Sequence, residues 1–186
     1  LAPLFLKQKF PWELTRDPAQ DPFELSSTML ATLWDRFQRY DRDRNGYMNF
    51  DDYFRRMLEY PRNSLTDSVF ELIESKSDTV MNFGEYVELT CTFACMEQVD
   101  LLKYFFYILD NKKTGLVEKN EVKHILVVMW EHVVSSNLKE AFDFLDSMDY
   151  GEGTFNFKEI QLLNTKYPNV FFPVFKLQIC MVKSSL

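Results

Sequence analysis

The chain has 186 residues, a net charge of −7 and a sequence pI near 4.9, and this acidic balance argues against a nucleic-acid partner, which favours a basic face. Hydrophobic residues make up 46% of it, so we expect a sizeable core in one domain or in two small lobes in close contact. Three cysteines give no even disulfide framework and indicate a reducing, cytoplasmic compartment. No apolar run approaches the roughly 20 residues of a membrane span.

The first stretch, residues 1–25, is predicted to be an extended arm. Four prolines interrupt any helix of useful length. Phe5, Phe10 and Trp12 are more large apolar groups than a flexible tail usually carries, so we expect the arm to lie in a groove of this chain or of a partner. The opening LAPLFLKQKF lacks the long apolar core of a secretory signal.

A helix, a loop and a second helix follow the arm. Ser26 or Ser27 is placed to cap a helix, and apolar residues at helical spacing continue to Tyr40. These apolar residues are Leu30, Leu33, Phe37 and Tyr40. After the loop, Tyr53, Phe54 and Met57 form the inner face of the leaving helix, which Pro61 is predicted to stop.

The loop between these helices, DRDRNGYMNFDD, resembles the twelve-residue calcium loop of an EF-hand. Its predicted metal ligands are Asp41, Asp43, Asn45, the Tyr47 carbonyl, Asn49 and Asp52. Gly46 stands at the sharp turn, and only the last ligand departs from the pattern, because Asp52 is one methylene shorter than the usual glutamate. We expect calcium affinity at the weak end, on the order of 10⁻⁵ to 10⁻³ M, with magnesium as an effective competitor.

The same spacing recurs three times, and each copy has lost ligands. The second loop, Glu74 to Glu85, has Lys76 at the third position and Thr79 in place of the turn glycine. The third loop, Asp110 to Glu121, keeps its glycine but also has a lysine, Lys112, at the third position. The fourth, Asp146 to Glu159, is fourteen residues long, with Asp146 as its first position and Gly153 at the turn. We predict that only the first loop binds an ion.

Four such units resemble the calmodulin superfamily, and most of all its calcineurin B and neuronal-calcium-sensor branch. The resemblance implies an all-α fold of four EF-hands paired into two lobes, an N-lobe at 26–93 and a C-lobe at 94–166, with the arm before them and a terminal segment at 167–186. It also implies short antiparallel pairing within each lobe, Met48 with Met81 and Val117 with Phe155.

The many phenylalanines are predicted to form the cores of the two lobes, because each hand alone leaves the inner faces of its helices exposed. The residues assigned to the core are Phe37, Phe54, Phe70, Phe105, Phe106, Phe142 and Phe144. Cys91 and Cys95 stand one helical turn apart and are interpreted as small core residues and not as zinc ligands.

An extra helix is predicted after Pro173. Its mostly apolar stripe consists of Val174, Phe175, Leu177, Gln178, Met181 and Val182. The stripe is expected either to fold back into the groove of the C-lobe or to dock on a partner.

Two functions are consistent with these patterns, and neither is enzymatic, because the sequence has no phosphate loop, GxSxG or HExxH. The degenerate loops favour a structural, protein-binding subunit of a larger assembly in the cytoskeleton or in the axoneme of a cilium or flagellum. The nearly complete first loop favours the alternative, a calcium-responsive regulatory subunit of calcineurin B type that binds an amphipathic helix of its target.

Overall fold

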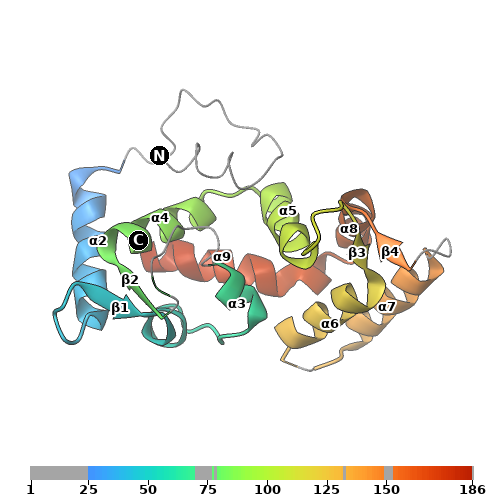
Figure 1. Cartoon of the computed structure of the whole chain (residues 1–186), viewed down its shortest axis with the longest axis horizontal. Helices are drawn as coiled ribbons and strands as arrows, with labels where there is room; N and C mark the ends of the chain where they lie inside the picture. Colours follow the sequence, from blue (N-terminus) through green and yellow to red (C-terminus); the bar gives the residue numbers. More distant parts are fainter. Residues whose placement is uncertain (1–24, 70–76, 78, 132, 149–152, 186) are drawn as a thin grey trace. The chain divides into compact units, whose positions relative to one another are not determined.

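The computed structural model describes residues 25–69, 77, 79–131, 133–148 and 153–185. Over these residues the fold is all-α, with two short two-stranded sheets (Figure 1). The described residues form two compact units. Unit 1 comprises those within 25–62, 66–96 and 177–185, and unit 2 those within 63–65 and 97–176. The predicted N-terminal arm lies outside the described residues.

The first hand of unit 1 begins with α2 (Ser27–Tyr40). Ser26 is its N-cap and accepts a hydrogen bond from the Met29 amide at 3.2 Å, as predicted. The helix ends immediately before Asp41 and is followed by β1 (Tyr47–Asn49) and by η1 (Asp52–Met57), a short π-helix. The leaving helix thus ends at Met57, before the predicted stop at Pro61.

The second hand contains α3 (Ser64–Ser68), β2 (Val80–Asn82) and α4 (Phe83–Ala94). Strands β1 and β2 pair in antiparallel fashion with Met48 opposite Met81, which confirms the implied register (Figure 1). Both methionine side chains are fully buried, so the strand pair fixes the loops over the core. Phe70, which was predicted to be a core residue, lies outside the described residues.

Unit 2 repeats this arrangement with two further hands. Its helices are α5 (Gln98–Leu109), α6 (Lys119–Met129), α7 (Ser136–Ser147) and α8 (Phe157–Lys166), followed by the 3₁₀ turn η3 (Pro168–Phe171). Strands β3 (Val117–Glu118) and β4 (Thr154–Phe155) pair with Val117 opposite Phe155, again the implied register.

Most of the predicted core phenylalanines are buried. These are Phe37, Phe54, Phe105 and Phe106. Phe142 and Phe144 on α7 are only half-buried, so their assignment to the core was wrong in part. Lys166 lies 3.8 Å from the Phe144 ring centroid and Lys123 lies 5.6 Å from that of Phe142, so each ring carries a cation at the surface.

Two buried tyrosines pack against each other in the core of unit 1, with ring centroids 5.9 Å apart. The Tyr53 hydroxyl forms a hydrogen bond with the Thr90 hydroxyl at 3.1 Å, whereas the Tyr86 hydroxyl is buried and has no hydrogen-bond partner among the described residues. Burial raises the pKa of both phenols, that of Tyr86 to about 12. Both tyrosines therefore stay neutral at physiological pH, and of the two hydroxyls that of Tyr53 has a hydrogen bond to a described residue.

Tyr86→Phe is accordingly expected to stabilise the protein, and Tyr53→Phe to destabilise it. Removing the unpaired buried hydroxyl of Tyr86 relieves its desolvation cost, whereas removing the paired hydroxyl of Tyr53 leaves Thr90 without that partner. We therefore expect each substitution to change the free energy of unfolding by about 1 kcal/mol, in opposite directions. Urea unfolding of the two variants beside the unchanged protein measures the difference. A loss of stability in Tyr86→Phe would show that its hydroxyl has a partner, such as a buried water.

The predicted terminal helix is α9 (Phe172–Ser185), and its second half belongs to unit 1. Leu177 and Met181 are fully buried. The Gln178 side-chain amide donates to the carbonyl of Phe93 at 3.0 Å, in the last turn of α4. It also donates to the carbonyl of Met96 at 2.6 Å, just beyond the end of that helix. The expectation of a C-lobe groove was therefore wrong for this segment, which packs with the first two hands.

Arg36 of α2 contacts the C-terminal end of α9. Its guanidinium donates to the Lys183 carbonyl at 3.1 Å, in the last turn of α9, where the helix leaves its carbonyls without backbone partners.

In the part of the chain that the structure describes, each helix is too short or too polar to cross a membrane.

Candidate metal centre

The first loop is organised by the carboxylate of Asp41, which α2 delivers to its entrance. Its two oxygens accept hydrogen bonds from the amides of Asn45 at 3.1 Å and Gly46 at 2.9 Å, and the residue is only 7% exposed. Gly46 has φ of +85°, a conformation that strongly favours glycine. The loop therefore already has the bend that places positions 1, 3 and 5 around a common centre.

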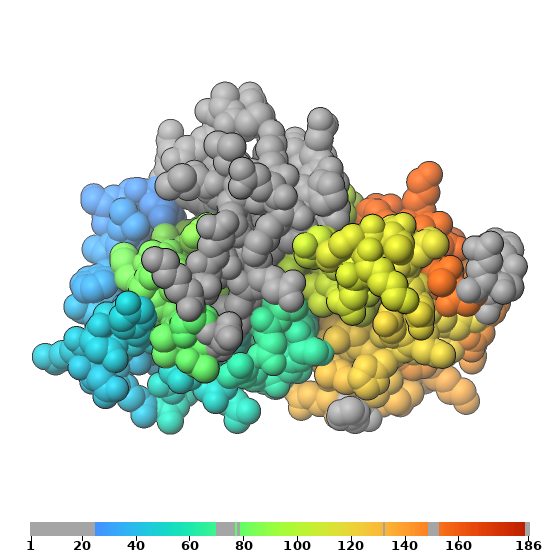
Figure 2. Space-filling model, viewed as in Figure 1, coloured from blue at the N-terminus to red at the C-terminus, as the bar shows by residue number. Residues whose placement is uncertain are grey.

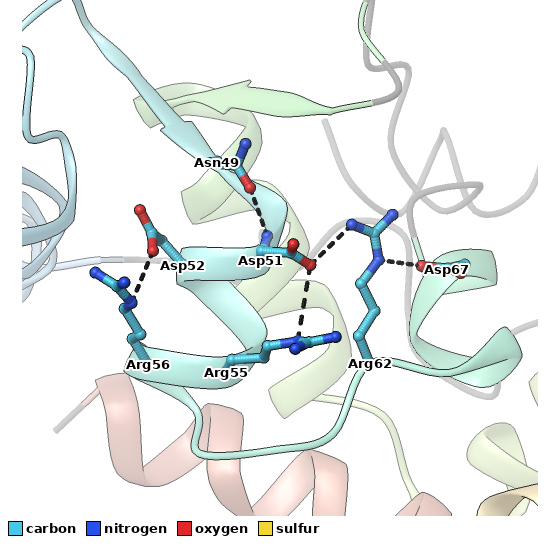
Figure 3. Close-up of polar contacts among 7 residues, drawn as sticks. All are labelled: Asn49, Asp51, Asp52, Arg55, Arg56, Arg62 and Asp67. Atoms are coloured by element: carbon cyan, nitrogen blue, oxygen red, sulfur yellow. Dashed lines mark hydrogen bonds and ion pairs between the residues drawn. The ribbon is translucent and has the colours of Figure 1, made fainter.

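Two asparagines hold the next turns of the loop. The Asn45 side-chain oxygen accepts from the Tyr47 amide at 2.9 Å, and that of Asn49 accepts from the Asp51 amide at 2.8 Å (Figure 3). A carbonyl oxygen has two lone pairs, so each can also serve a cation. Asp43 is exposed at the third position. Every predicted ligand is thus an oxygen, which suits a hard divalent ion such as calcium or magnesium.

The last predicted ligand, Asp52, is engaged elsewhere. One carboxylate oxygen lies 3.1 Å from Arg56 Nε (Figure 3). The other lies 3.9 Å from Arg42 Nε. Its side chain is 20% exposed, less than either arginine. Among the described residues, no three acidic, histidine or cysteine side chains are gathered closely enough to hold a metal. The donor set fits the ion, but Asp52 must change partners to complete it.

The neighbouring acid, Asp51, belongs to a separate network. It pairs with Arg62 at 3.0 Å and with Arg55 at 3.9 Å, and Arg62 also binds Asp67 on α3 at 2.6 Å (Figure 3). The hydrogen bonds to Asp67 and Asp51 raise the pKa of Arg62. Sequence reasoning missed both networks, although the i,i+4 spacing of Asp51 with Arg55 and of Asp52 with Arg56 was a signal.

The third loop has the same entrance but an internal cation. Asp110, 6% exposed, accepts from the amides of Thr114 at 2.9 Å and Gly115 at 2.7 Å. Lys112, at the third position, lies 3.9 Å from Glu118 at the ninth. An ammonium group thus stands beside one of the acidic side chains that an ion would need, which supports the prediction that this loop does not bind calcium well.

The final glutamates of the second and fourth loops are used as helix caps. Glu85 accepts from the Asn82 amide at 2.8 Å and Glu159 from the Asn156 amide at 2.7 Å, and each asparagine returns the bond as N-cap of the following helix. Both glutamates therefore have a structural function without an ion. Glu74 and Lys76 of the second loop lie outside the described residues.

Asp146 does not open the fourth loop in the way that Asp41 and Asp110 open theirs. Helix α7 continues through it to Ser147, and its carboxylate binds Lys123 at 2.6 Å and Lys119 at 3.3 Å. These partners, Lys123 first, lower the pKa of Asp146. The predicted start of the loop at Asp146 therefore differs from the structure, in which α7 extends through Asp146 to Ser147, whereas Gly153 has the positive φ expected at the turn position.

Among the residues that the structure describes, the cysteines belong to no group of metal-ligating side chains. Cys91 is buried, and its burial, with a smaller effect of Cys95, raises the pKa of its thiol to about 11. It is therefore protonated at neutral pH and packs as a small apolar residue. Cys95 and Cys180 are half-buried and reduced.

Comparison with known proteins identifies distant relatives. The chain is 27% identical over 114 residues to calcineurin B type 2 of Dictyostelium discoideum, covering 61% of this chain and 60% of the relative. It is 25% identical to calcineurin B of Naegleria gruberi, over 70% of this chain and 75% of the relative. It is also 25% identical to troponin C of Tyrophagus putrescentiae, over 76% of this chain and 96% of the relative. No family model matches the chain.

The match covers only part of some relatives, since the two calcineurin B proteins of Dictyostelium discoideum are spanned over 60% and 65% of their length. Calcineurin B and troponin C are EF-hand proteins. Together with the helix–loop–helix units and the strand register at loop position 8, the similarity defines an all-α fold of EF-hand type.

Proposed function

We propose that the chain is a non-enzymatic, calcium-binding regulatory subunit that acts by binding another protein, with its divalent site at the first loop only. The ion is calcium, with magnesium as competitor, held by Asp41, Asp43, Asn45, the Tyr47 carbonyl, Asn49 and Asp52. The observation that carries the proposal is the preformed entrance at Asp41, followed by oxygen-bearing residues at the ligand positions.

The restriction to one loop follows from a comparison of entrances. Asp41 and Asp110 hold their loops with the same pair of amide hydrogen bonds, but of these two loops the third has a lysine at position 3 and the first has Asp43 there. In the fourth loop, the carboxylate of Asp146 is paired with Lys119 and Lys123. An ion is thus favoured only where the carboxylates are not already paired with an ammonium group.

The relatives supply the direction of the functional proposal. The calcineurin relatives are named as subunits, and therefore as parts of a larger protein assembly. We accordingly place a calcium-responsive subunit of calcineurin B type, which binds an amphipathic helix in the cytoplasm, ahead of the structural subunit that the sequence favoured. Binding of the ion would change the conformation of the first loop. The strand pair β1 and β2 would transmit this change to the surface that binds the partner.

A structural, calcium-independent subunit stays as the second candidate because of one group of contacts. Arginine, lysine and helix-cap partners already satisfy acidic side chains in all four hands. Such hands need no ion to fold. The assignment of this subunit to a cytoskeletal or axonemal assembly rests on analogy alone.

Co-purification with and without calcium separates the two candidates. The full chain, tagged and expressed in its own cells, is captured in excess EGTA and in calcium, and the eluates are compared by mass spectrometry. A regulatory subunit is expected to retain a partner at raised calcium and to lose it in EGTA, with magnesium as a control for nonspecific divalent effects. Partners retained equally in EGTA would support the structural candidate, because a weak site shifts a tight complex little.

A further inference from the structure

Seven of the eight arginines of this chain lie in one region of the sequence. Every arginine after Arg16 lies between Arg36 and Arg62, whereas all basic residues beyond Arg62 other than histidine are lysines. Arg42 and Arg44 occupy positions 2 and 4 of the first loop, and Arg56 follows it. All three side chains are exposed. Figure 2 shows the surface of the first hand in blue to cyan. Guanidinium groups match carboxylates in a fork that an ammonium cannot reproduce.

Asp52 is a carboxylate held between two of these arginines. Arg56 and Arg42 bind its separate oxygens, each through Nε, and their side chains are 50% and 59% exposed. The Arg56 backbone is fixed independently, because its carbonyl accepts from the Tyr40 hydroxyl at 3.3 Å. Asp52 therefore lies within ion-pair distance of both arginines, and of the two the backbone of Arg56 has a further contact that fixes it.

An ion in the first loop requires the same carboxylate. Without the ion, the three acids at loop positions 1, 3 and 12 are balanced by Arg42, Arg44 and Arg56. With it, Asp52 turns to the cation, and the loop gains two positive charges together with two arginines that have lost their partner. Interactions between exposed charges farther apart than the Debye length of about 8 Å are largely screened at physiological ionic strength, so the charges of the first hand matter most for a ligand bound there.

From this exchange we infer that calcium gates a binding surface for an acidic peptide, formed by Arg42 and Arg56. The inference rests on the proposed ion site. Asp52 is the intramolecular stand-in for the peptide carboxylate, and the ion releases the surface by taking Asp52 away. The arginine pair thus lowers calcium affinity, and it links ion binding to recognition of a run of aspartates or glutamates.

The first test measures the competition between arginine and ion. Calorimetric calcium titration of Arg56→Gln is expected to show affinity raised about two- to fivefold, as removal of one surface ion pair allows. Arg55→Gln is the matched control, because Arg55 is the next residue along and pairs with Asp51. It should leave calcium affinity unchanged. Circular dichroism shows that both variants are folded.

The second test measures the surface itself with a labelled oligoglutamate peptide, by fluorescence anisotropy of the full chain. Binding is expected in calcium, absent in EGTA, and weakened about tenfold in Arg56→Gln even at saturating calcium, as loss of a charged hydrogen bond allows. An oligolysine peptide of equal length and phosphatidylserine vesicles are run in parallel.

The outcomes separate the two levels of the proposal. Absence of calcium heat in the unchanged protein would overturn the ion site and, with it, this inference. If calcium binds but Arg56→Gln has unchanged affinity, or Arg55→Gln shifts it equally, the exchange at Asp52 is wrong while the ion site stands. Equal peptide binding in EGTA, or binding to vesicles and not to the peptide, would overturn the acidic-peptide surface.

Discussion

Asp41→Ala is expected to abolish the heat of calcium binding. The substitution removes the first ligand and also the acceptor of the Asn45 and Gly46 amides, so the loop loses both its charge and its bend. Two amides lose their partner near a buried position, so we also expect a loss of about 1 to 3 kcal/mol in the free energy of unfolding. Calorimetry gives the first effect and urea unfolding the second.

Asp110→Ala is the matched control for this experiment. Asp110 holds the amides of Thr114 and Gly115 with the same geometry and is equally buried. Its removal should cost a similar amount of stability and leave the calcium heat unchanged. Binding heat that survives Asp41→Ala and disappears in Asp110→Ala would move the ion site to the third loop.

Met181→Ala is expected to be among the most destabilising single substitutions in the terminal helix. Met181 is fully buried in unit 1, and truncation of a buried methionine leaves a cavity that costs about 2 to 5 kcal/mol. We expect a corresponding fall in the midpoint of urea unfolding, with increased binding of a hydrophobic dye as α9 loosens.

Ile179, two residues away on the same helix, is 44% exposed and provides the control. Ile179→Ala should change the unfolding free energy by about 0.5 kcal/mol or less. Similar effects of the two substitutions would show that the helix is not seated on the face that Leu177 and Met181 define.

The parts of the fold that depend on local spacing could be predicted from the sequence. The cap at Ser26 and the end of α2 before Asp41 follow from a polar residue before an apolar period and a loop signature after it. The pairing of Met48 with Met81 was implied by the resemblance to the calmodulin superfamily, and the structure confirms it. The helix prediction needs only short-range regularities, whereas the strand pairing depended on the resemblance.

The sequence allowed the candidate metal ligands to be named, but it did not allow the partners of their side chains to be predicted. Asp52 has two interpretations at the level of sequence, metal ligand or i,i+4 partner of Arg56, and the choice depends on where η1 places both side chains. Asp146 presents the same difficulty with Lys119 and Lys123, which approach it from another helix. Side-chain pairing across elements depends on packing that no local pattern specifies.

The destination of α9 was unpredictable for a related reason. Its apolar stripe shows that the helix is covered, but not by which unit. The contacts that decide the matter are between side chains and the open ends of helices, Gln178 at the end of α4 and Arg36 at the end of α9 itself. Such carbonyl contacts have no signature in the spacing of residues.

Equilibrium dialysis of the full chain against radioactive calcium tests the central claim, that the first loop alone binds an ion. We expect saturation at one ion per chain, with a dissociation constant on the order of 10⁻⁵ to 10⁻³ M. Saturation at two or more ions, or no binding in this range, would contradict the claim.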